Sequence, residues 1–380
     1  MKRVHTNEKV DIAIVGAGIV GLAHALEAAK QGYAVRVFER NRRPLGASIR
    51  NFGMILPLGM KPGIQHDRAL RSRAIWQSII RETSLWHSDQ GVMVPAYHAD
   101  EQRAMEEFIA WGPSNDYAVS WLNAAQATDL SPVNAHNLRG ALYSSIELLI
   151  NPKEALDVLV EFLRTRYNVR FDFNTVVTAV DAPALIAGGQ EMQAERVVVC
   201  CGSDFQTLYP TALAGQPAKQ CKLQMMQTKP QASNWSLGPF LATGLSLTHY
   251  ASFAACPSVH DIRNRVAEDC PDLIRWGIHF LVAQYANGQL VIGDSHVYDD
   301  MIDPFDDQEI DQLIMDYVPT FLTPPTLEID KRWHGIYTKT ETGEPLILAP
   351  APHVRIVTGL GGGGMTTSFA LAQDVFEAWN

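Results

Sequence analysis

The stretch DIAIVGAGIVGLAHALEAAKQGYAVRVFER at residues 11–40 constrains the fold more than any other part of the sequence. The apolar, β-rich run over 10–15 predicts a strand, the glycines after it predict a turn, and the alanine-rich run over 22–31 predicts a helix. Residues 33–38 predict a second strand. Two strands joined by a helical crossover lie parallel, so the sequence predicts an α/β fold.

The basic start of the chain, with Lys2 and Arg3, gives this stretch some likeness to a secretory signal. However, Asp11 enters the apolar run, Glu27 and Lys30 close it, and no small-residue cleavage site follows. We therefore expect a nucleotide-binding unit. No apolar run approaches the roughly 20 residues of a membrane-spanning helix, so we expect no membrane partner.

The bulk properties narrow the class of protein. The chain has 380 residues, of which 47% are hydrophobic, and this length predicts two intertwined domains. A net charge of −10 gives no electrostatic reason to bind nucleic acid or an anionic membrane. The five cysteines show no C-x-x-C spacing, which predicts no metal site and fits a reducing, cytoplasmic location. The sequence leaves open whether the chain forms an oligomer.

The first glycine turn has a specific chemistry. Gly16, Gly18 and Gly21 match G-x-G-x-x-G between a predicted strand and a predicted helix. The first glycine makes the tight turn, the second lets a pyrophosphate approach the backbone, and the third lets the helix pack closely on the strand. Glu39 ends the second strand, where a carboxylate accepts hydrogen bonds from ribose hydroxyls. These features predict a bound dinucleotide.

A second glycine loop, GLGGGGMTTSFALA at 359–372, follows the apolar run VRIVTG and opens a terminal helix. A nicotinamide enzyme has no need of such a loop. In a flavin enzyme, a helix N-terminus at the pyrimidine end of the ring stabilises the negative charge that grows there on reduction. The loop therefore favours FAD over a nicotinamide cofactor.

Other elements follow from periodicity and capping. Helices are predicted over 69–86, over 101–111 and from Asn151, as cap, through Pro152 to about Arg166. The runs LSLTHYASFA, GIHFLVAQYANGQLVIGDS and TLEIDKRWHGIYTKT alternate apolar and polar residues, and ANGQ carries the N-G signal of a hairpin turn. They predict a mostly antiparallel sheet.

The two glycine motifs, with GAS at 46–48, NPKEALDVL, TVVTAV, VVVCCG and WHGIYTKTETGEP between them, resemble the FAD-dependent amine and amino-acid oxidases of the D-amino-acid oxidase, glycine oxidase and sarcosine oxidase group. The resemblance implies a Rossmann-like FAD-binding domain of the GR2-type flavoprotein architecture, beside a substrate domain on a mostly antiparallel sheet. The implied FAD-binding domain comprises 1–80, 145–215 and 331–380, and the substrate domain comprises 81–144 and 216–330.

The resemblance also implies which residues meet the cofactor. Val177 touches the adenine through its backbone, and Gly202 closes a strand near the pyrophosphate. Sarcosine-oxidase-like members attach FAD through a cysteine where this chain has Gly335, so the FAD is expected to be noncovalent. The full predicted set is Gly16, Gly18, Ile19, Gly21, Glu39, Arg40, Ala47, Ser48, Arg50, Asn51, Val177, Gly202, Gly361, Gly362, Gly363, Gly364, Met365 and Thr366.

The substrate side departs from the family. Glycine-oxidase-like members carry arginines at Tyr337 and at about Gly362, and sarcosine-oxidase-like members carry a lysine near Thr366; this chain has none of these cations. A bidentate carboxylate clamp needs a guanidinium, so a plain α-amino acid is not the expected substrate. The catalytic candidates are Arg50, Tyr337, His279, His249 and Lys339, with His334 as a further histidine, the histidines lying on strand-like runs.

The segment ASIRNFGMILP also resembles a subgroup associated with aminophosphonate breakdown. The sequence therefore predicts FAD-dependent oxidative deamination or demethylation of a small acidic amine, best an aminoalkylphosphonate or its N-methyl derivative. Hydride transfer to flavin and imine hydrolysis would be followed by reoxidation by dioxygen or another acceptor. The alternatives are an amino-acid or hydroxy-acid dehydrogenase using an electron carrier, a non-catalytic flavin-binding subunit, and a nicotinamide dehydrogenase.

Overall fold

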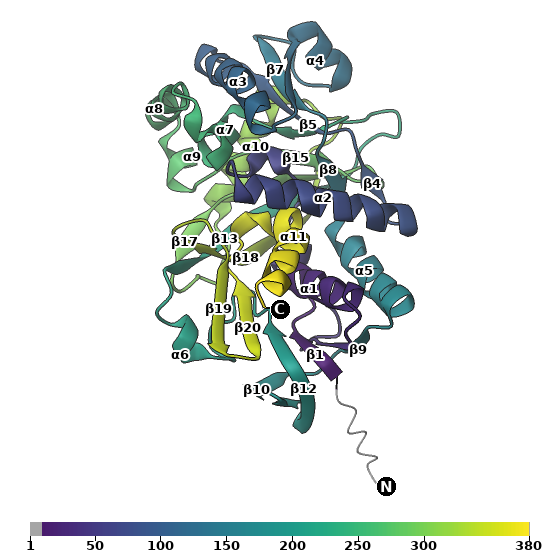
Figure 1. Ribbon diagram of the computed structural model, residues 1–380. Coiled ribbons are helices and arrows are strands. Elements are labelled where there is room, and N and C mark those ends of the chain that lie inside the picture. The colour runs from purple at the N-terminus through teal and green to yellow at the C-terminus, as the bar shows by residue number, and fades with distance from the viewer. Residues whose placement is uncertain (1–9, 380) are drawn as a thin grey trace.

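The computed structural model describes residues 10–379 and contains two large sheets with helices packed around them (Figure 1). Lys2 and Arg3, which suggested a signal segment, lie outside the described residues. The first sheet contains the predicted strand–turn–helix–strand unit. Its parallel strands run in the order β9–β2–β1–β12–β20. Their bounds are β1 Val10–Val15, β2 Val35–Phe38, β9 Arg170–Asp172, β12 Gln190–Val199 and β20 Val354–Thr358.

An antiparallel extension continues this sheet from β12 through β11 to β10, and β19 adds to β20 on the other side. The bounds are β10 Val177–Asp181, β11 Ala184–Ala187 and β19 Leu346–Ala351. The parallel strands β1, β2 and β20 are mostly buried, as expected for a sheet covered by helices, whereas β9 at the edge is partly exposed.

Four helices pack around this sheet: α1 Ile19–Lys30, α2 Ile64–Glu82, α5 Pro152–Tyr167 and α11 Gly364–Glu377. The first and last helices, α1 and α11, lie against one another, and α2 packs against α11 (Figure 1). Trp76 of α2 packs edge-on against Phe369 of α11, with ring centroids 5.0 Å apart. Its buried Nε1 donates to Met365 O at 2.9 Å, which satisfies the indole N–H. Early and late parts of the chain therefore form one unit.

Helix boundaries follow the caps. Asn151 Oδ1 accepts from Lys153 N at 3.2 Å, which confirms the predicted start of α5. In contrast, the helix predicted over 69–86 was displaced. The observed α2 begins at Ile64 because Gly63, with φ +89°, turns the chain into the helix, and it ends before Thr83, whose backbone is extended. Trp86 lies beyond it and packs on Tyr285.

The second sheet has nine strands and is mostly antiparallel, as predicted. Only the pair β14–β5 is parallel. Asn287 and Gly288 lie in the turn between β15 and β16, which confirms the predicted hairpin. The bounds are β5 Val92–Ala96, β6 Val119–Asn123, β7 Gly140–Ser144, β13 Ala218–Pro230, β14 Phe240–Ala242, β15 Leu281–Gln284, β16 Gln289–Gly293, β17 Val297–Asp299 and β18 Ile329–Thr340.

One strand prediction was wrong. The run LSLTHYASFA forms the helix α7 Gly244–His249 and a 3-10 turn over Ala251–Ala255. Thr243 and Ser246 form a capping box, with Thr243 N donating to Ser246 Oγ at 3.4 Å. Alternation of apolar residues suits a strand, but the cap and the burial of Leu245 and Leu247 select the helix. His249 therefore ends a helix.

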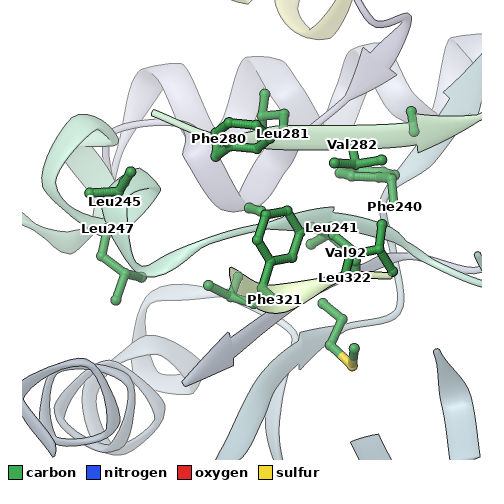
Figure 2. Close-up of a cluster of buried hydrophobic side chains, with 14 of the residues drawn as sticks. Val92, Phe240, Leu241, Leu245, Leu247, Phe280, Leu281, Val282, Phe321 and Leu322 are labelled. Carbon is green, nitrogen blue, oxygen red and sulfur yellow. The ribbon is translucent and has the colours of Figure 1, made fainter. Parts of the chain in front are cut away.

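Helices also cover this sheet, which alternation alone did not predict. They are α3 Ala99–Trp111, α8 Val259–Asp269, α9 Pro271–Arg275 and α10 Gln308–Phe321, and α3 matches its prediction within two residues. Figure 2 shows part of the core between them: Phe280 lies near Phe321 at the end of α10, with ring centroids 5.5 Å apart, beside Leu241 of β14. Leu245 and Leu247 of α7 complete the cluster (Figure 2).

A small third sheet joins β3 Met54–Ile55, β8 Leu148–Ile150 and β4 His87–Ser88, and the short helices α4 Ala124–Leu130 and α6 Pro210–Leu213 lie elsewhere. The division into two discontinuous domains stays a prediction; its boundary at 331 falls inside β18, which pairs with β13 of the second sheet. Across residues 10–379, no helix combines the length and apolarity that crossing a bilayer requires.

Candidate active site

A cavity of about 560 Å³ is lined by residues from both large sheets. It meets the carboxyl ends of β1, β2 and β12 on one side and the second sheet on the other. All the residues that the sequence predicted as cofactor contacts line it, and so do all five catalytic candidates. Their individual roles stay predictions, but the structure brings them to one cavity.

The first glycine turn is built as its sequence predicted. Gly16 has φ +100°, a backbone conformation that favours glycine, and its N–H donates to Phe38 O at 2.8 Å. A Cβ atom at Gly21 would lie 1.9 Å from Gly16 O, so no side chain fits there. Ser48 Oγ accepts from Ile19 N at 2.9 Å and caps the start of α1 from a distant loop. The turn therefore depends on both local glycines and a tertiary cap.

Glu39 shapes this turn directly. Its Oε2 accepts from Ala17 N at 3.0 Å, and its Oε1 accepts from Asn41 N at 3.0 Å. Thr175 N donates to Glu39 O at 2.9 Å, which brings the strand of Val177 beside it. The sequence predicted a ribose contact for this carboxylate but missed its bond to the turn. Because Oε1 also accepts from Asn41 Nδ2 at 3.1 Å, a ribose hydroxyl can use the remaining lone pair of Oε2.

The second glycine loop meets the first. Gly361–Gly363 form a 3-10 turn and α11 begins at Gly364. A Cβ atom at Gly364 would lie 3.6 Å from Ile19 Cγ2, so the two helix openings converge, as expected. Gly362 has open space where a Cβ would stand. Two helix N-termini with exposed backbone N–H groups at one cavity fit a flavin dinucleotide, because each favours an anionic group.

Several predicted cofactor residues also hold the surrounding loops. Arg40 pairs with Asp204, and although burial raises the pKa of that carboxyl, hydrogen bonds from Thr207 and Arg40 lower it to about 2. Asn51 Nδ2 donates to Ala47 O at 2.9 Å. Elsewhere, Thr366 Oγ1 accepts from Leu56 N at 3.1 Å, and Gly202 O accepts from Thr358. These bonds fix the cavity wall whatever the cofactor contacts are.

Two cations line the cavity without a carboxylate partner. Arg50 Nη1 donates to His334 O at 3.2 Å, and Lys339 Nζ donates to Tyr298 OH at 3.4 Å. Within residues 10–379, neither side chain forms an ion pair, and both are partly buried. A Cβ atom at Gly335 would lie 3.1 Å from Arg50 O, so the backbone of Arg50 packs against this glycine.

Tyr337 lies beside these cations in β18. Burial raises its pKa well above the usual value, and the neighbouring Cys221 and Tyr298 add to the rise. Burial likewise raises the pKa of the Cys221 thiol to about 12. Both groups therefore keep their protons at neutral pH, and Tyr337 can donate a hydrogen bond to a ligand.

Three histidine rings gather at the same wall. His249 ends α7, His279 precedes β15 and His296 precedes β17. The ring centroids of His249 and His279 are 3.8 Å apart, and that of His296 lies 4.5 and 4.7 Å from them. Burial lowers the pKa of His249 and His279 well below the usual value and that of His296 to about 4, so the rings are neutral at pH 7.

The sequence predictions missed His296 and its neighbour Asp294. Asp294 is 6% exposed, burial raises its pKa well above the usual value, and its Oδ1 lies 3.4 Å from His279 Nε2. The signal was the polar GDSH segment after the buried strand LVIG. His334 lies away from the cavity, where its Nδ1 bonds Asp306 Oδ1 at 2.8 Å.

Comparison with known proteins agrees with this geometry. The family described as FAD dependent oxidoreductase matches residues 11–378. Glycine oxidase from Geobacillus kaustophilus is 27% identical over 147 residues, and glycerol 3-phosphate dehydrogenase from Caloramator mitchellensis is 24% identical over 155 residues. These matches cover 36% and 40% of this chain, and 38% and 32% of the relatives' own lengths.

The fold itself is shared with solved structures. Glycine oxidase from Bacillus cereus superposes with a TM-score of 0.77 at 17% identity, covering 98% of this chain and 96% of that one. The overlap includes both the parallel, glycine-lined unit and the antiparallel sheet, because nearly the whole of each chain is matched. The predicted fold class is therefore confirmed.

Proposed function

Because the chain belongs to the family of FAD dependent oxidoreductases, we propose that it oxidises the carbon–nitrogen bond of a small amine that carries an acid group. Bound FAD supplies the acceptor for the hydride, and water then hydrolyses the resulting imine to a carbonyl compound and a free amine or ammonia. The observation that carries the proposal is the pair of unpaired cations, Arg50 and Lys339, at the cavity that the two glycine loops share.

The two cations provide a place for the acid group. Arg50 uses one guanidinium N–H on His334 O, which leaves its other donors for a ligand. Lys339 Nζ makes a long bond to Tyr298 OH and lies 5.5 Å from the centroid of that ring, and neither contact neutralises its charge. A charged group in a partly buried site, unneutralised by protein, favours an anionic ligand. These residues would orient the substrate with its amine toward the glycine loops.

The substrate class follows from what the site lacks. A planar carboxylate clamp needs a guanidinium fork, and Tyr337 and Gly362 occupy the positions where one was expected. A phosphonate presents three oxygens and up to two charges, which two separate cations on different elements can share. We therefore favour an aminoalkylphosphonate or its N-methyl derivative. The phenol of Tyr337, which keeps its proton, can donate to a further oxygen.

The FAD would be held without a covalent bond. The position where some relatives attach it is Gly335, which has no side chain and packs against Arg50. Acid precipitation of the purified protein should release all the yellow colour into the supernatant, and colour in the pellet would contradict this.

A second candidate is the oxidation of a hydroxy acid or phosphorylated alcohol, with electrons passed to a carrier. The likeness to a glycerol 3-phosphate dehydrogenase favours it, because that name describes a phosphate-bearing alcohol as substrate. Hydrogen peroxide formed with an amine substrate would favour the amine oxidase. Flavin reduction only by hydroxy acids, without peroxide, would favour the dehydrogenase.

The decisive experiment is anaerobic reduction of the bound flavin by amino acids, N-methyl amino acids, aminophosphonates and hydroxy acids. We expect the absorbance near 450 nm, the ordinary oxidised-flavin band, to bleach with aminophosphonates. Arg50→Ala should then raise KM about 10- to 100-fold, because a hydrogen bond to a charged group is lost, and Arg50→Lys should recover part of the loss. Arg103→Ala, an exposed arginine paired with Asp261, is the control. An unchanged KM removes Arg50 from the site.

A further inference from the structure

The histidine cluster has an unusual hydrogen-bond pattern. Gly277 O can only accept, so its 3.1 Å bond to His296 Nδ1 places the hydrogen on Nδ1 and leaves a lone pair on Nε2. Ser246 Oγ donates to Phe280 O at 3.1 Å, so it must accept from His279 Nδ1. The neutral His279 ring therefore also has its lone pair on Nε2.

These two lone pairs face a carboxylate. His279 Nε2 lies 3.4 Å from Asp294 Oδ1, and His296 Nε2 lies 3.9 Å from Asp294 Oδ2. Asp294 Oδ1 is buried and has no hydrogen-bond partner among the described residues. Buried acceptors that face one another without a donor cost about 1–3 kcal/mol each, so either a proton or a metal cation must lie between them.

The nitrogen positions suit a metal ion. Ligand atoms of His249, His279 and His296 lie within 4.8 Å of one another, the one group of this kind among residues 10–379. Two nitrogens bound at about 2.0–2.1 Å in a tetrahedral site lie about 3.4 Å apart, so binding must draw the widest pair together by up to about 1.4 Å. The rings of His249 and His279, which are stacked, must also turn so that their lone pairs converge. The second bonds of His279 and His296 orient the rings, as outer partners do in metal sites.

We propose that His249, His279 and His296 bind a divalent transition-metal ion of the zinc class at the wall of the cavity. Three neutral imidazoles are a common ligand set for such ions and leave one position open. The ion would displace the proton that Asp294 otherwise holds, and the resulting carboxylate would offset the ion's charge in a buried place. The proposal departs from the sequence prediction of no metal site, which rested on cysteine spacing and stays untested.

The three histidines line the same cavity as Arg50 and Lys339, so a ligand in that cavity can reach the open position. We infer that it receives an oxygen of the substrate's acid group, a step that rests on the proposed function. The ion would take the place of the missing arginine clamp. Because a lone pair that holds a metal cannot also accept a proton, His249 and His279 would then act as metal ligands and not as proton acceptors.

The test measures zinc on the FAD-loaded full chain. Metal is removed with a chelator, Zn²⁺ is returned by dialysis at graded free concentrations, and bound zinc is determined by mass spectrometry. We expect about one zinc ion per FAD, with nitrogen neighbours at about 2.0–2.1 Å by X-ray absorption at the zinc edge. Asp294→Asn should weaken zinc binding about 10- to 100-fold.

Matched variants separate the site from adventitious binding. The double variant His279→Asn/His296→Asn should lose at least about 100-fold in zinc affinity, whereas His334→Asn, a histidine outside the cavity, should lose none. If the double variant releases its FAD, His249→Gln takes its place, because His249 is partly exposed at the end of α7. Equal zinc binding by the wild type and these cluster variants overturns the proposal.

The same preparations distinguish this proposal from the proposed function. Stoichiometric zinc with no flavin reduction by any amine keeps the metal site and removes amine oxidation. Flavin reduction by amines in a protein that never binds zinc keeps the oxidase and removes the metal site.

Discussion

The two walls of the cavity are built in different ways. The cofactor wall is made of backbone: Gly16, Gly18 and Gly21 open α1, and Gly361 to Gly364 open α11. The opposite wall is made of buried side chains. There, His279 and His296 from loops next to β15 and β17 face Asp294. The cofactor wall can approach a ligand closely because its glycines have no side chains, whereas the opposite wall depends on contacts between particular side chains.

The two walls also differ in how strongly they depend on charge and pH. Backbone N–H groups at a helix start are polar but carry no titratable proton, so the cofactor wall changes little with pH. Around the second sheet, burial moves the pKa values of three histidines and of Asp294. We therefore expect steric changes to break the first wall, and changes of charge or pH to affect the second region.

The largest expected effect is steric. Gly21→Val would place Cβ 1.9 Å from Gly16 O, a backbone atom that cannot move without opening the turn. We expect FAD affinity to fall by at least about 100-fold, equivalent to about 2.7 kcal/mol, measured by fluorescence titration of the apoprotein. Gly215→Ala is the control, because nothing lies within 4 Å of a Cβ there. Full FAD retention by Gly21→Val would show that the turn is not a cofactor wall.

The next effect concerns charge near the second sheet. Glu147 is fully buried between β7 and β8, its Oε1 accepts from Leu58 N at 3.2 Å, and its Oε2 has no partner among the described residues. Burial raises its pKa from 4.5 to about 7, outweighing the bonds and the nearby Arg73 that lower it. The folded state therefore holds the proton more tightly than the unfolded state, and the wild type loses stability as pH rises from about 4.5 through 7.

Glu147→Gln removes this charge while keeping the shape. We expect it to raise the free energy of unfolding by about 3 kcal/mol at pH 8 and by under about 1 kcal/mol at pH 5, measured by urea denaturation. Glu161→Gln, at an exposed position of α5, should change neither value by more than about 0.5 kcal/mol. A stabilisation that is the same at both pH values would mean that the carboxyl is not buried as described.

The smallest expected effect tests how far the cofactor wall depends on a side chain. Ser48→Ala removes the acceptor for Ile19 N, leaving one N–H at the start of α1 without its cap. We expect a loss of about 1 kcal/mol in stability and less than about tenfold in FAD affinity, because the glycine backbone remains. Ser78→Ala, on the exposed face of α2, serves as control. A loss of FAD affinity as large as that of Gly21→Val would show that the cofactor wall depends on a side chain as much as on its glycines.

Predictions from the sequence succeeded where the determinant is local. The turn at 16–21, the cap at Asn151 and the Asn287–Gly288 turn each follow from a few neighbouring residues whose sterics or hydrogen bonds fix the backbone. They were less successful where one sequence pattern is compatible with both a strand and a helix. LSLTHYASFA alternates like a strand, yet its capping box and packing made it a helix.

The sequence by itself determined the cofactor half of this protein, because glycine's lack of a side chain acts on the residues beside it and is visible in the printed order. It also suggested Arg50 and Lys339 as candidate substrate cations, a role that stays a prediction. Only the tertiary structure decided that Gly364 lies against Ile19, and that His249, His279 and His296 share one wall with Asp294. These contacts depend on how whole strands and helices pack, so they cannot be predicted from a short run of residues.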